Sequence, residues 1–469
     1  MSSLGYQVVY QRFNAHPDIQ CERAVLPTNI QKFRQTGRPL TTIETGQTVG
    51  GADCIAISLA FEPDIFNVLE LLSLARIPAL RTERGTDYAP VVLGGPITMS
   101  NALPLAPFAD AIVLGDAEVV VEALSEALLR EKDHQNRHEL LEELSTLPGV
   151  FVPEFHGTAV PDLNVSPTDD LPAVGGIWTP DSELSGMRLI EVARGCPRYC
   201  SFCVMRAAAQ PMREAPLEKV AEALNTDAPR IGFVGAAVSE YSHIRETLKL
   251  AISAGKGVGI SSLRADRLDE EFVGLLHEGG YRTMTIASDA PSQTLRARLK
   301  KGLRDRHLIR AAELAAQFKM KVLKMYVIVG LPNETLDDID ELANFSLTLQ
   351  SIIPRVALGI APFVPKLHTP LGDAPFEDVK VLERRLKHLR NRLKGRVEMR
   401  SVSARWAWVE YRLSQGGVEA GYAAYEAWKN GGSMANYRRA FAAADQRESQ
   451  RAALITAQEH GLWDPAGMR

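Results

Sequence analysis

The chain has 469 residues, of which 45% are hydrophobic and 23% charged, and its formal net charge is −4. This composition is typical of a globular protein with room for two or three packed cores. The slightly acidic balance excludes a globally basic nucleic-acid binder, although local basic faces are still allowed. The sequence has no apolar run of the ~18 residues that a membrane span needs, and its N-terminus lacks the pattern of a signal peptide. We therefore expect a cytoplasmic protein with no membrane partner.

Residues 1–150 alternate short apolar runs with helical segments. The runs lie in 52–61, 89–97 and 109–118, and glycines follow two of them directly. This alternation predicts a Rossmann-like α/β domain with a ligand-binding crevice at its strand ends. The first apolar residues of the chain, Leu4, Val8, Val9 and Phe13, are spaced as in a helix. A sheet of this kind should begin with a strand instead. We therefore expect that the first strand is missing and that the true start lies upstream of Met1.

Residues 151–186 are rich in Pro, Gly and Asp, and we expect a linker there. From 187 to 375 the sequence again alternates apolar strand candidates with amphipathic segments. Parallel strands joined by right-handed crossovers are expected from this alternation. The pattern predicts a partial (β/α)6 barrel of the TIM type, with functional residues at the carboxyl ends of its strands. Its six strand candidates lie in 189–192, 230–238, 257–265, 281–289, 321–330 and 355–364.

Three of the chain's five cysteines, Cys196, Cys200 and Cys203, lie within eight positions directly after the apolar run 189–192. A structural zinc site usually recruits four ligands in two separated pairs, so this spacing favours a single inorganic core. Three thiolates would leave one iron of a 4Fe–4S cluster without a protein ligand, open to a substrate or cofactor. Zinc with a distant histidine such as His243, and reduced bystander thiols, stay open as alternatives.

The segment 196–203 reads CPRYCSFC and resembles the signature of the radical S-adenosylmethionine (SAM) superfamily, with the aromatic Phe202 before the last cysteine. The resemblance is closest to members that carry a cobalamin-binding-like domain in front of the radical barrel. It implies a 4Fe–4S cluster whose free iron is chelated by SAM. It also implies an external one-electron reductant of the flavodoxin or ferredoxin type, whose electron cleaves SAM to a 5′-deoxyadenosyl radical.

Two barrel strands end in further candidate cofactor contacts, and the resemblance implies the first of them. Gly235, Ala236 and Ala237 stand where the family has a small-residue turn that lets backbone approach the methionine end of SAM. A tight strand-to-helix turn would need the same small residues. Ser262 and Arg264 end the next strand candidate, together with a nearby aspartate. This polar set either faces the pocket or caps the following helix.

Two later segments also resemble family motifs. Asp289 stands where the family usually has a glutamate that binds polar groups of the cofactor, and its shorter side chain weakens that expectation. Gly330, Leu331 and Pro332 resemble the Gly-Leu-Pro turn of the family. The spacing from Thr335 to the aspartate three residues later also predicts a capping box that opens a helix.

Two pairs in the N-terminal region resemble the serine-leucine and double-glycine loops that accommodate the nucleotide tail of cobalamin. These pairs are Ser58 with Leu59 and Gly94 with Gly95. A glycine after a strand is most often only a turn, so the order of the domains carries most of this expectation. The DxHxxG pattern, which would supply an axial histidine ligand, does not occur in this sequence.

Residues 376–469 are expected to form a helical region that closes the open side of the barrel or covers the substrate entrance. Its first helix, near 377–394, has a leucine face and several basic residues. A solvated face explains these charges, and a nucleic-acid patch formed with 296–307 is the disfavoured alternative. Resembling methylthiotransferases act on transfer RNA, but they carry three further N-terminal cysteines, whereas this chain has only Cys21 and Cys54 left over.

The barrel's last strand candidate is followed by Pro365, Lys366, His368 and Thr369, which the resemblance suggests form a substrate-side loop. Altogether the resemblance implies a radical SAM enzyme with a 4Fe–4S cluster, SAM and cobalamin, and we expect a methyltransferase acting on an unactivated carbon. A radical cyclisation or rearrangement enzyme and an RNA-modifying radical SAM enzyme are the alternatives. A non-catalytic iron–sulfur protein is the alternative from another class.

Overall fold

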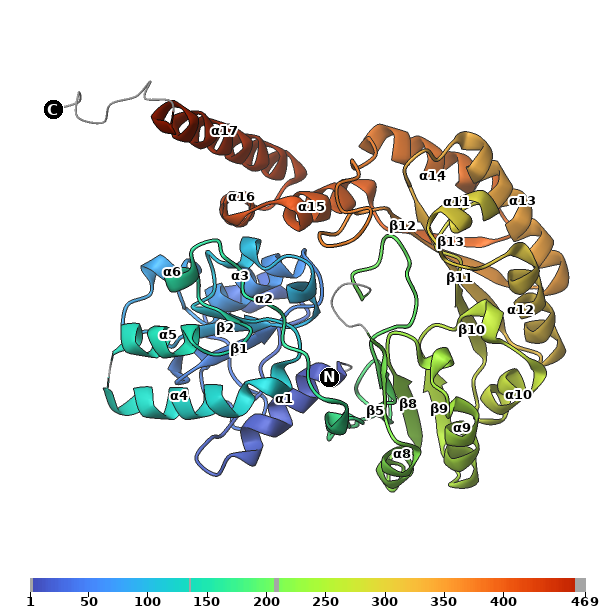
Figure 1. Cartoon of the computed structure of the whole chain (residues 1–469), viewed down its shortest axis with the longest axis horizontal. Coiled ribbons are helices and arrows are strands. Elements are labelled where there is room, and N and C mark those ends of the chain that lie inside the picture. The colour runs from blue at the N-terminus through green and yellow to red at the C-terminus, as the bar shows by residue number, and fades with distance from the viewer. Residues whose placement is uncertain (1–2, 135, 206–210, 460–469) are drawn as a thin grey trace. The chain divides into compact units, whose positions relative to one another are not determined.

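The computed structural model describes residues 3–134, 136–205 and 211–459, and its chain forms two compact units (Figure 1). Each unit is assembled from three separate segments of sequence. Unit 1 comprises Met1–Gln20, Gly115–Glu122 and Leu163–Tyr411. Unit 2 comprises Cys21–Leu114, Ala123–Asp162 and Arg412–Arg469.

Unit 1 contains two parallel sheets that together form an open barrel wall (Figure 1). The first sheet contains β5 (Met187–Glu191), β8 (Arg230–Val234) and β9 (Gly257–Ile260). The second contains β10 (Thr283–Ala287), β11 (Val322–Val329), β12 (Val356–Pro362) and β13 (Glu398–Ser401). A parallel bridge between Leu263 and Ile286 connects the two sheets. All these strands run in the same direction, so their carboxyl ends lie along one edge.

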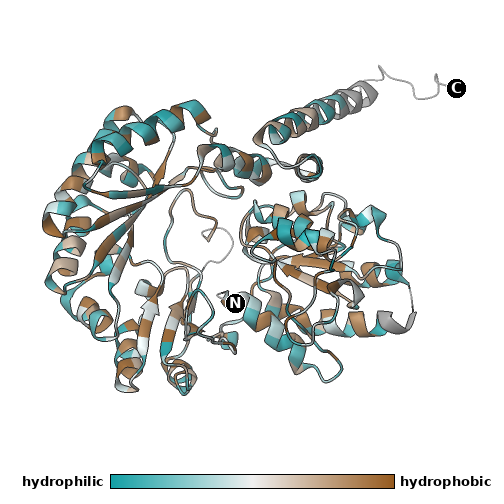
Figure 2. Ribbon diagram, turned by 180° about the vertical axis from the view of Figure 1, so that it is seen from behind, coloured by the Kyte–Doolittle hydropathy of each residue, from teal (hydrophilic) through white to brown (hydrophobic). Residues whose placement is uncertain are grey.

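Helices cover the outer side of this wall, as Figure 1 shows. They are α8 (Leu217–Ala223), α9 (Ile244–Ser253), α10 (Glu270–Glu278), α11 (Gln293–Arg298), α12 (Asp305–Gln317), α13 (Leu336–Ile352) and α14 (Val379–Leu393). Alternate side chains of the strands pack under them, such as Leu323, Met325 and Val327 of β11, which are buried in the main core. Figure 2 shows hydrophobic residues concentrated in the strands and hydrophilic ones on the outer helices, as this packing requires.

The six predicted barrel strands are all present, and the capping box at Thr335 is confirmed at the start of α13. The structure adds β13, which pairs in parallel with β12. Its sequence, Glu-Met-Arg-Ser, has no apolar run, and therefore the hydrophobic pattern could not reveal it. Two other short strands, β6 (Ala193–Arg194) and β7 (Arg213–Glu214), pair antiparallel beside the barrel.

The first helix, α1 (Leu4–Ala15), packs in unit 1, whereas the sequence pattern placed it in the N-terminal domain. Leu4 and Val8 join a small core with Met187 and Leu189 of β5. The buried side chain of Gln7 accepts a hydrogen bond from the Ile177 backbone at 3.0 Å. The helix therefore covers part of the barrel's first strand.

Unit 2 is built on a four-stranded sheet in the order β1 (Ile55–Ser58), β2 (Val91–Gly94), β3 (Ala111–Val113) and β4 (Val150–Phe151). The first three strands are parallel and β4 is antiparallel to β3. The helices associated with this region are α2 (Ile30–Gln35), α3 (Asp64–Leu74), α4 (Val121–His134), α5 (Arg137–Ser145) and α6 (Pro153–His156). The α/β organisation expected from the N-terminal sequence is present, and its parallel strands follow one another in chain order.

The C-terminal helices complete unit 2. The helix α15 (Ala404–Gln415) leads out of unit 1, and α16 (Val418–Lys429) and α17 (Met434–Glu459) follow. On α16 the Trp428 indole donates a hydrogen bond to Glu70 of α3 at 2.6 Å. The Asn101 amide donates to the carbonyl of Gly416 at 2.8 Å. None of the helices in the described ranges has the length and apolar character needed to cross a membrane.

Candidate active site

The three clustered cysteines lie on the loop between β6 and β7. Backbone hydrogen bonds fasten this loop on two sides, because the Ser201 N–H donates to Leu299 at 3.0 Å and the Ser201 carbonyl accepts from Leu371 at 3.1 Å. The Phe202 side chain packs against a separate core cluster under the loop, which contains Ala290, Leu295, Leu299, Leu331 and Phe363. The aromatic residue before the last cysteine thus anchors the loop to the barrel.

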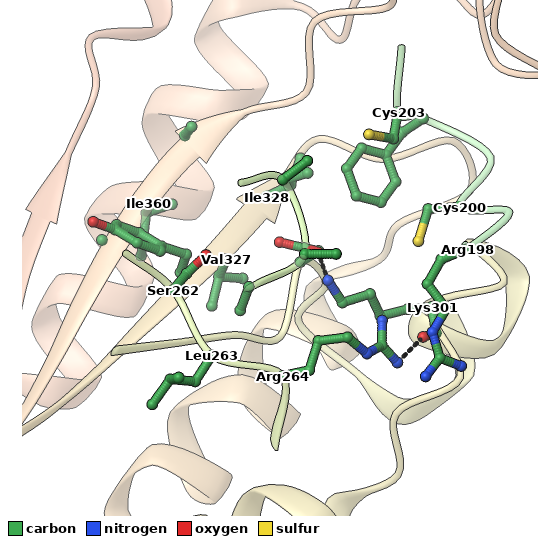
Figure 3. Close-up of a pocket in the computed structure, with 18 of the residues that line it drawn as sticks. Arg198, Cys200, Cys203, Ser262, Leu263, Arg264, Lys301, Val327, Ile328 and Ile360 are labelled. Carbon is green, nitrogen blue, oxygen red and sulfur yellow. Dashed lines mark hydrogen bonds and ion pairs between the residues drawn. The ribbon is translucent and has the colours of Figure 1, made fainter. Parts of the chain in front are cut away.

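A cavity of about 700 Å³ opens at the carboxyl ends of the barrel strands, and all three cysteines line it. Figure 3 shows Cys200 and Cys203 on one side of this cavity, with Val327 and Ile360 on the opposite side. The lining includes six residues that the sequence singled out as cofactor contacts, namely Phe202, Ala236, Ala237, Ser262, Arg264 and Asp289. The cavity therefore brings together residues from the carboxyl ends of six strands, β8 to β13, and from the cysteine loop.

Burial controls the electrostatics of the cysteine loop. It raises the pKa of the Cys200 thiol, although the positive charge of Lys301 opposes this effect. It also raises the pKa of the Cys203 thiol, against a hydrogen bond from the Met205 backbone. Such thiols stay protonated at neutral pH until a coordinated metal removes the proton. Without a bound metal, neither thiol is therefore a reactive thiolate at neutral pH.

A charged network forms the wall of the cavity next to this loop. Glu240, whose side chain is almost fully buried, lies 2.6 Å from the guanidinium of Arg198 and 3.1 Å from that of Arg264. Arg264 also pairs with Asp266 at 3.0 Å and donates to the carbonyl of Lys301 at 3.0 Å. The sequence left open whether this polar set caps the following helix. In the structure Asp269 caps that helix, α10. Ser262 and Arg264 consequently face the cavity.

Asp289 and Lys301 form an ion pair on the same wall (Figure 3). Asp289 adopts a left-handed backbone conformation with φ of 60°, and its N–H donates to the carbonyl of Tyr326 at 3.1 Å. With this backbone conformation the chain leaves the direction of β10, and the Asp289 side chain lines the cavity. Sequence reasoning missed Arg198, Glu240 and Lys301, because their importance arises from partners far away in the chain.

Gly235 lies next to the start of the cysteine loop. It is not among the lining residues, whereas Ala236 and Ala237 are. A Cβ atom at Gly235 would lie 2.5 Å from the carbonyl oxygen of Ala193, just before the cysteine loop. The small-residue turn therefore allows β8 to pass close to the loop's first flank, which explains the glycine structurally.

The Gly-Leu-Pro turn also lies outside the cavity lining. Gly330 adopts φ of 83° and donates its N–H to the carboxylate of Glu334 at 2.9 Å, while Leu331 packs in the cluster that contains Phe202. Burial raises the pKa of Glu334 to about 7. The N–H groups of Gly330 and Leu331 and the guanidinium of Arg385, 3.1 Å away, oppose this increase. Pro332 completes this turn, which supports the cysteine loop through packing.

The loop after β12 makes no direct contribution to the cavity lining either. Lys366 pairs with Glu410 at 2.9 Å, and Thr369 donates to the Lys366 carbonyl at 2.8 Å. His368 has φ of 63°, which is typical of a turn. Pro365 and these residues thus shape the loop that, through Leu371, holds Ser201. His243, the alternative zinc ligand, caps α9 and also lies outside the lining.

In unit 2 the two expected pairs of residues meet at the carboxyl ends of β1 and β2. The Leu59 N–H donates to the Gly94 carbonyl at 2.9 Å. Gly95 has φ of 103° and ψ of −178°, and a Cβ atom there would lie 2.5 Å from the Leu59 carbonyl oxygen. Ser58 is exposed, but the Leu59 side chain is fully buried. This edge consequently presents backbone, Ser58 and glycine.

Two family models match the chain over these regions. Residues 190–346 match the model described as "Radical SAM superfamily", and residues 5–153 match "Radical SAM proteins, N-terminal". The first match begins at β5 and contains the cysteine loop, the charged wall and the Gly-Leu-Pro turn. The chain belongs to the radical SAM superfamily. Membership implies a 4Fe–4S cluster, SAM and an external electron donor.

The chain is also similar to individual proteins in sequence or in fold. An uncharacterised protein of Methanocaldococcus jannaschii is 28% identical over 376 residues, which are 77% of this chain and 79% of the relative. The structure of the radical SAM methyltransferase TsrM from Kitasatospora setae is similar with a TM-score of 0.53 and 14% identity, covering 82% of this chain and 74% of TsrM. The cobalamin-dependent radical SAM enzyme OxsB is similar with a TM-score of 0.50 and 16% identity, covering 74% of this chain and 49% of OxsB. At these identities the two structures share the fold.

The residues of this radical SAM protein fit a 4Fe–4S cluster. Within the described ranges, no three His, Cys, Asp or Glu side chains converge on a single ion. A cubic cluster instead takes its three cysteine ligands on three separate irons, so three cysteines of one loop that line the same cavity suit it. Cys21 and Cys54 belong to unit 2, where burial raises their pKa values to about 11 and about 12. They take no part in the lining of the cavity.

Proposed function

We propose that this radical SAM protein is a cobalamin-dependent methyltransferase that acts on an unactivated carbon. The observation that carries the proposal is the combination of two strand-end sites in one chain. The cavity of unit 1 is lined by Cys196, Cys200 and Cys203, and the sheet of unit 2 ends in an open edge of backbone and glycine. Parallel sheets commonly bind cofactors at such edges.

In unit 1, the three cysteines would hold the cluster and the charged wall would hold SAM. Arg264 and Lys301 supply positive charge for the cofactor's carboxylate, and Asp289 supplies an acceptor for its amino or hydroxyl groups. Ala236 and Ala237 leave room for backbone to approach the methionine end. Ser262 offers a further hydroxyl in the same cavity. These groups are already held in place by ion pairs, which limits the cost of ordering them on binding.

In unit 2, Ser58, Gly94 and Gly95 would receive the nucleotide tail of cobalamin. The backbone at Gly95 lies so close to Leu59 that a Cβ atom would lie 2.5 Å from the Leu59 carbonyl oxygen, so this position of the edge suits glycine alone. TsrM and OxsB, whose structures contain cobalamin according to their descriptions, share the fold. The Leu59 side chain is buried, so its contribution would come from its backbone alone.

The proposed reaction consumes two SAM molecules and two electrons from the external reductant. One SAM gives up its methyl group and leaves as S-adenosylhomocysteine. The other is cleaved reductively to methionine and a radical that takes a hydrogen atom from the substrate and leaves as 5′-deoxyadenosine. The substrate thereby exchanges one hydrogen for one methyl group. The cofactors supply this chemistry, and the protein supplies binding and orientation.

The experiment uses anaerobically reconstituted protein, loaded with cobalamin and passed through gel filtration. We expect about one cobalamin to be retained per chain, in keeping with a dedicated binding domain. With the true substrate and a reductant, S-adenosylhomocysteine and 5′-deoxyadenosine should form in about equal amounts. Formation of 5′-deoxyadenosine alone by the cobalamin-saturated protein would contradict methyl transfer and favour a cyclisation or rearrangement.

A further inference from the structure

The loop that carries the three cysteines leaves and re-enters the barrel through a minimal antiparallel pair. Ala193 is paired with Glu214 and Arg194 with Arg213. Two residues on each side form a weak ladder by themselves, because isolated short hairpins are marginal in water. Other interactions must therefore fix the two flanks of this loop.

A single carboxylate joins both flanks. Oδ2 of Asp116 lies 3.3 Å from a guanidinium nitrogen of Arg194 and 3.3 Å from one of Arg213. The same oxygen accepts hydrogen bonds from the backbone and the hydroxyl of Ser166, at 2.9 and 3.0 Å. The carboxylate is almost fully buried. It therefore connects the residue before the loop with the residue after it.

The remaining charges near this carboxylate belong mainly to the first flank. Arg194 pairs with Glu118 at 2.8 Å and with Glu191 of β5 at 2.6 Å. Ser166 accepts from Arg194 at 2.9 Å and from Arg213 through its backbone carbonyl. Burial alone would raise the pKa of Asp116, but Arg194, Ser166 and Arg213 outweigh it and hold the pKa below its ordinary value. The carboxylate stays ionised at neutral pH.

The backbone before Asp116 is itself held firmly. Gly115 has φ of 75°, and a Cβ atom there would lie 2.3 Å from the carbonyl oxygen of Asn164. The Asp116 N–H donates to this carbonyl at 3.0 Å. The left-handed conformation and the close approach require glycine at 115, and together they aim Asp116 at the two arginines.

We propose that Asp116 is a positioning residue that clasps both ends of the cysteine loop and so fixes the cluster relative to the SAM pocket. The proposal rests on the radical SAM assignment and is independent of cobalamin and of methyl transfer. Asp116 lies within the residues that match the N-terminal family model, yet it packs in unit 1. Part of the active-site geometry is therefore supplied by a segment outside the barrel sequence.

The principal test is Asp116→Asn in the full chain, reconstituted with iron and sulfide under anaerobic conditions. The amide keeps the shape but loses the charge that attracts the two arginines. We expect the variant to bind as much iron as the wild type, with a changed electron paramagnetic resonance signal of the reduced cluster when SAM is added. The kcat of reductive SAM cleavage should fall by about 10- to 100-fold, because small displacements of reacting groups cost this much. The KM for SAM should change less.

Asp110→Asn is a matched control. Oδ2 of Asp110 is also buried and also pairs with two arginines, Arg84 at 3.1 Å and Arg137 at 2.6 Å, and accepts from the Val91 N–H at 2.7 Å. It belongs to unit 2, whereas both flanks of the cysteine loop belong to unit 1. We expect this variant to lose stability but to keep the wild-type spectrum and kcat. Equal losses of kcat in the two variants would overturn the positioning role.

A graded series covers the case in which Asp116→Asn fails to fold. Arg213→Gln releases only the second flank, and Glu118→Gln removes only one partner of Arg194. Both should change the SAM-bound cluster signal and lower kcat, by less than Asp116→Asn where that variant folds, and Asp116→Glu should restore part of the rate. Wild-type spectra and rates in Arg213→Gln and Glu118→Gln would refute the clasp.

Discussion

The two strand-end edges of this protein differ in what they present to a ligand. In unit 1 the edge carries charged and sulfur-bearing side chains from many segments, with Cys200, Arg264 and Lys301 facing one cavity. In unit 2 the edge consists of Ser58 and backbone, with Gly95 in a conformation that only glycine adopts readily. The first edge shows its chemistry through side chains, and the second offers only its shape. Function can therefore be inferred much further for the first edge.

The largest effect is expected when a cluster ligand of unit 1 is removed. Replacing Cys196, Cys200 or Cys203 with Ala should abolish reductive SAM cleavage, because three thiolates are needed to hold a cluster with one open iron. The reconstituted wild type should bind about four irons. Iron content, absorbance and 5′-deoxyadenosine release measure this effect.

The control for these variants is Cys21→Ala and Cys54→Ala. Both thiols lie in unit 2 and neither lines the cavity, so their replacement should leave iron binding and SAM cleavage intact. If the variant with Cys196, Cys200 and Cys203 all replaced by Ala kept its cluster while Cys21→Ala lost it, the assignment of the ligands to unit 1 would be wrong.

A more selective change, Gly95→Ala, addresses the edge of unit 2. The new Cβ would lie 2.5 Å from a backbone oxygen, and the backbone conformation costs about 1–3 kcal/mol for any other residue. We expect weaker retention of cobalamin in gel filtration with unchanged iron content and SAM cleavage. Gly37→Ala is the matched control, since Gly37 also has positive φ but no atom lies near its Cβ position. Equal cobalamin retention in both variants would argue against a role of this edge.

The smallest expected effect concerns Glu334, which supports the edge of unit 1. Its folded pKa of about 7 exceeds the unfolded value of 4.5, so the folded state binds the proton more tightly. This contribution to the free energy of unfolding is fully present below about pH 4.5 and is lost as the pH rises through 7. It amounts to about 3 kcal/mol at most. In Glu334→Gln this pH dependence should disappear, and denaturant unfolding at pH 5 and pH 8 measures it; an unchanged difference between the two pH values would contradict the assignment.

Much of unit 1 could be predicted from sequence because its signals are local. The apolar runs of β8 to β12 and the spacing of the three cysteines each lie within a dozen residues. The charged wall could not be predicted in this way. Glu240, Arg264 and Lys301 acquire their roles only when the segments that follow three different strands meet, and no periodicity marks an ion pair between distant residues. The polar set at a strand end located Arg264 with its partner Asp266, and the family resemblance located Asp289, but neither located Glu240 or Lys301.

The short or interrupted parts were harder to predict. β6 and β7 contain two residues each, too few for any pattern, and yet they bound the cysteine loop. Gly330 and Leu331 resembled a cofactor-binding turn, but they support the loop from behind through Glu334 and Phe202. Each unit is assembled from three segments, and the sequence did not predict this grouping. The apolar face of an amphipathic helix shows that the helix packs on something, but it does not show which sheet it covers.

The alternation of the chain between its two units has a consequence for its synthesis on the ribosome. The sheet of unit 2 has emerged once Phe151 is made, but α16, which packs on α3, follows only after the whole barrel sequence. Domains usually fold as they emerge, N-terminal part first. Here the N-terminal sheet must wait for the last segment, and a nascent chain that stops early leaves the apolar surface of α3 uncovered. Only a chain that extends through α16 can bury that surface in this way.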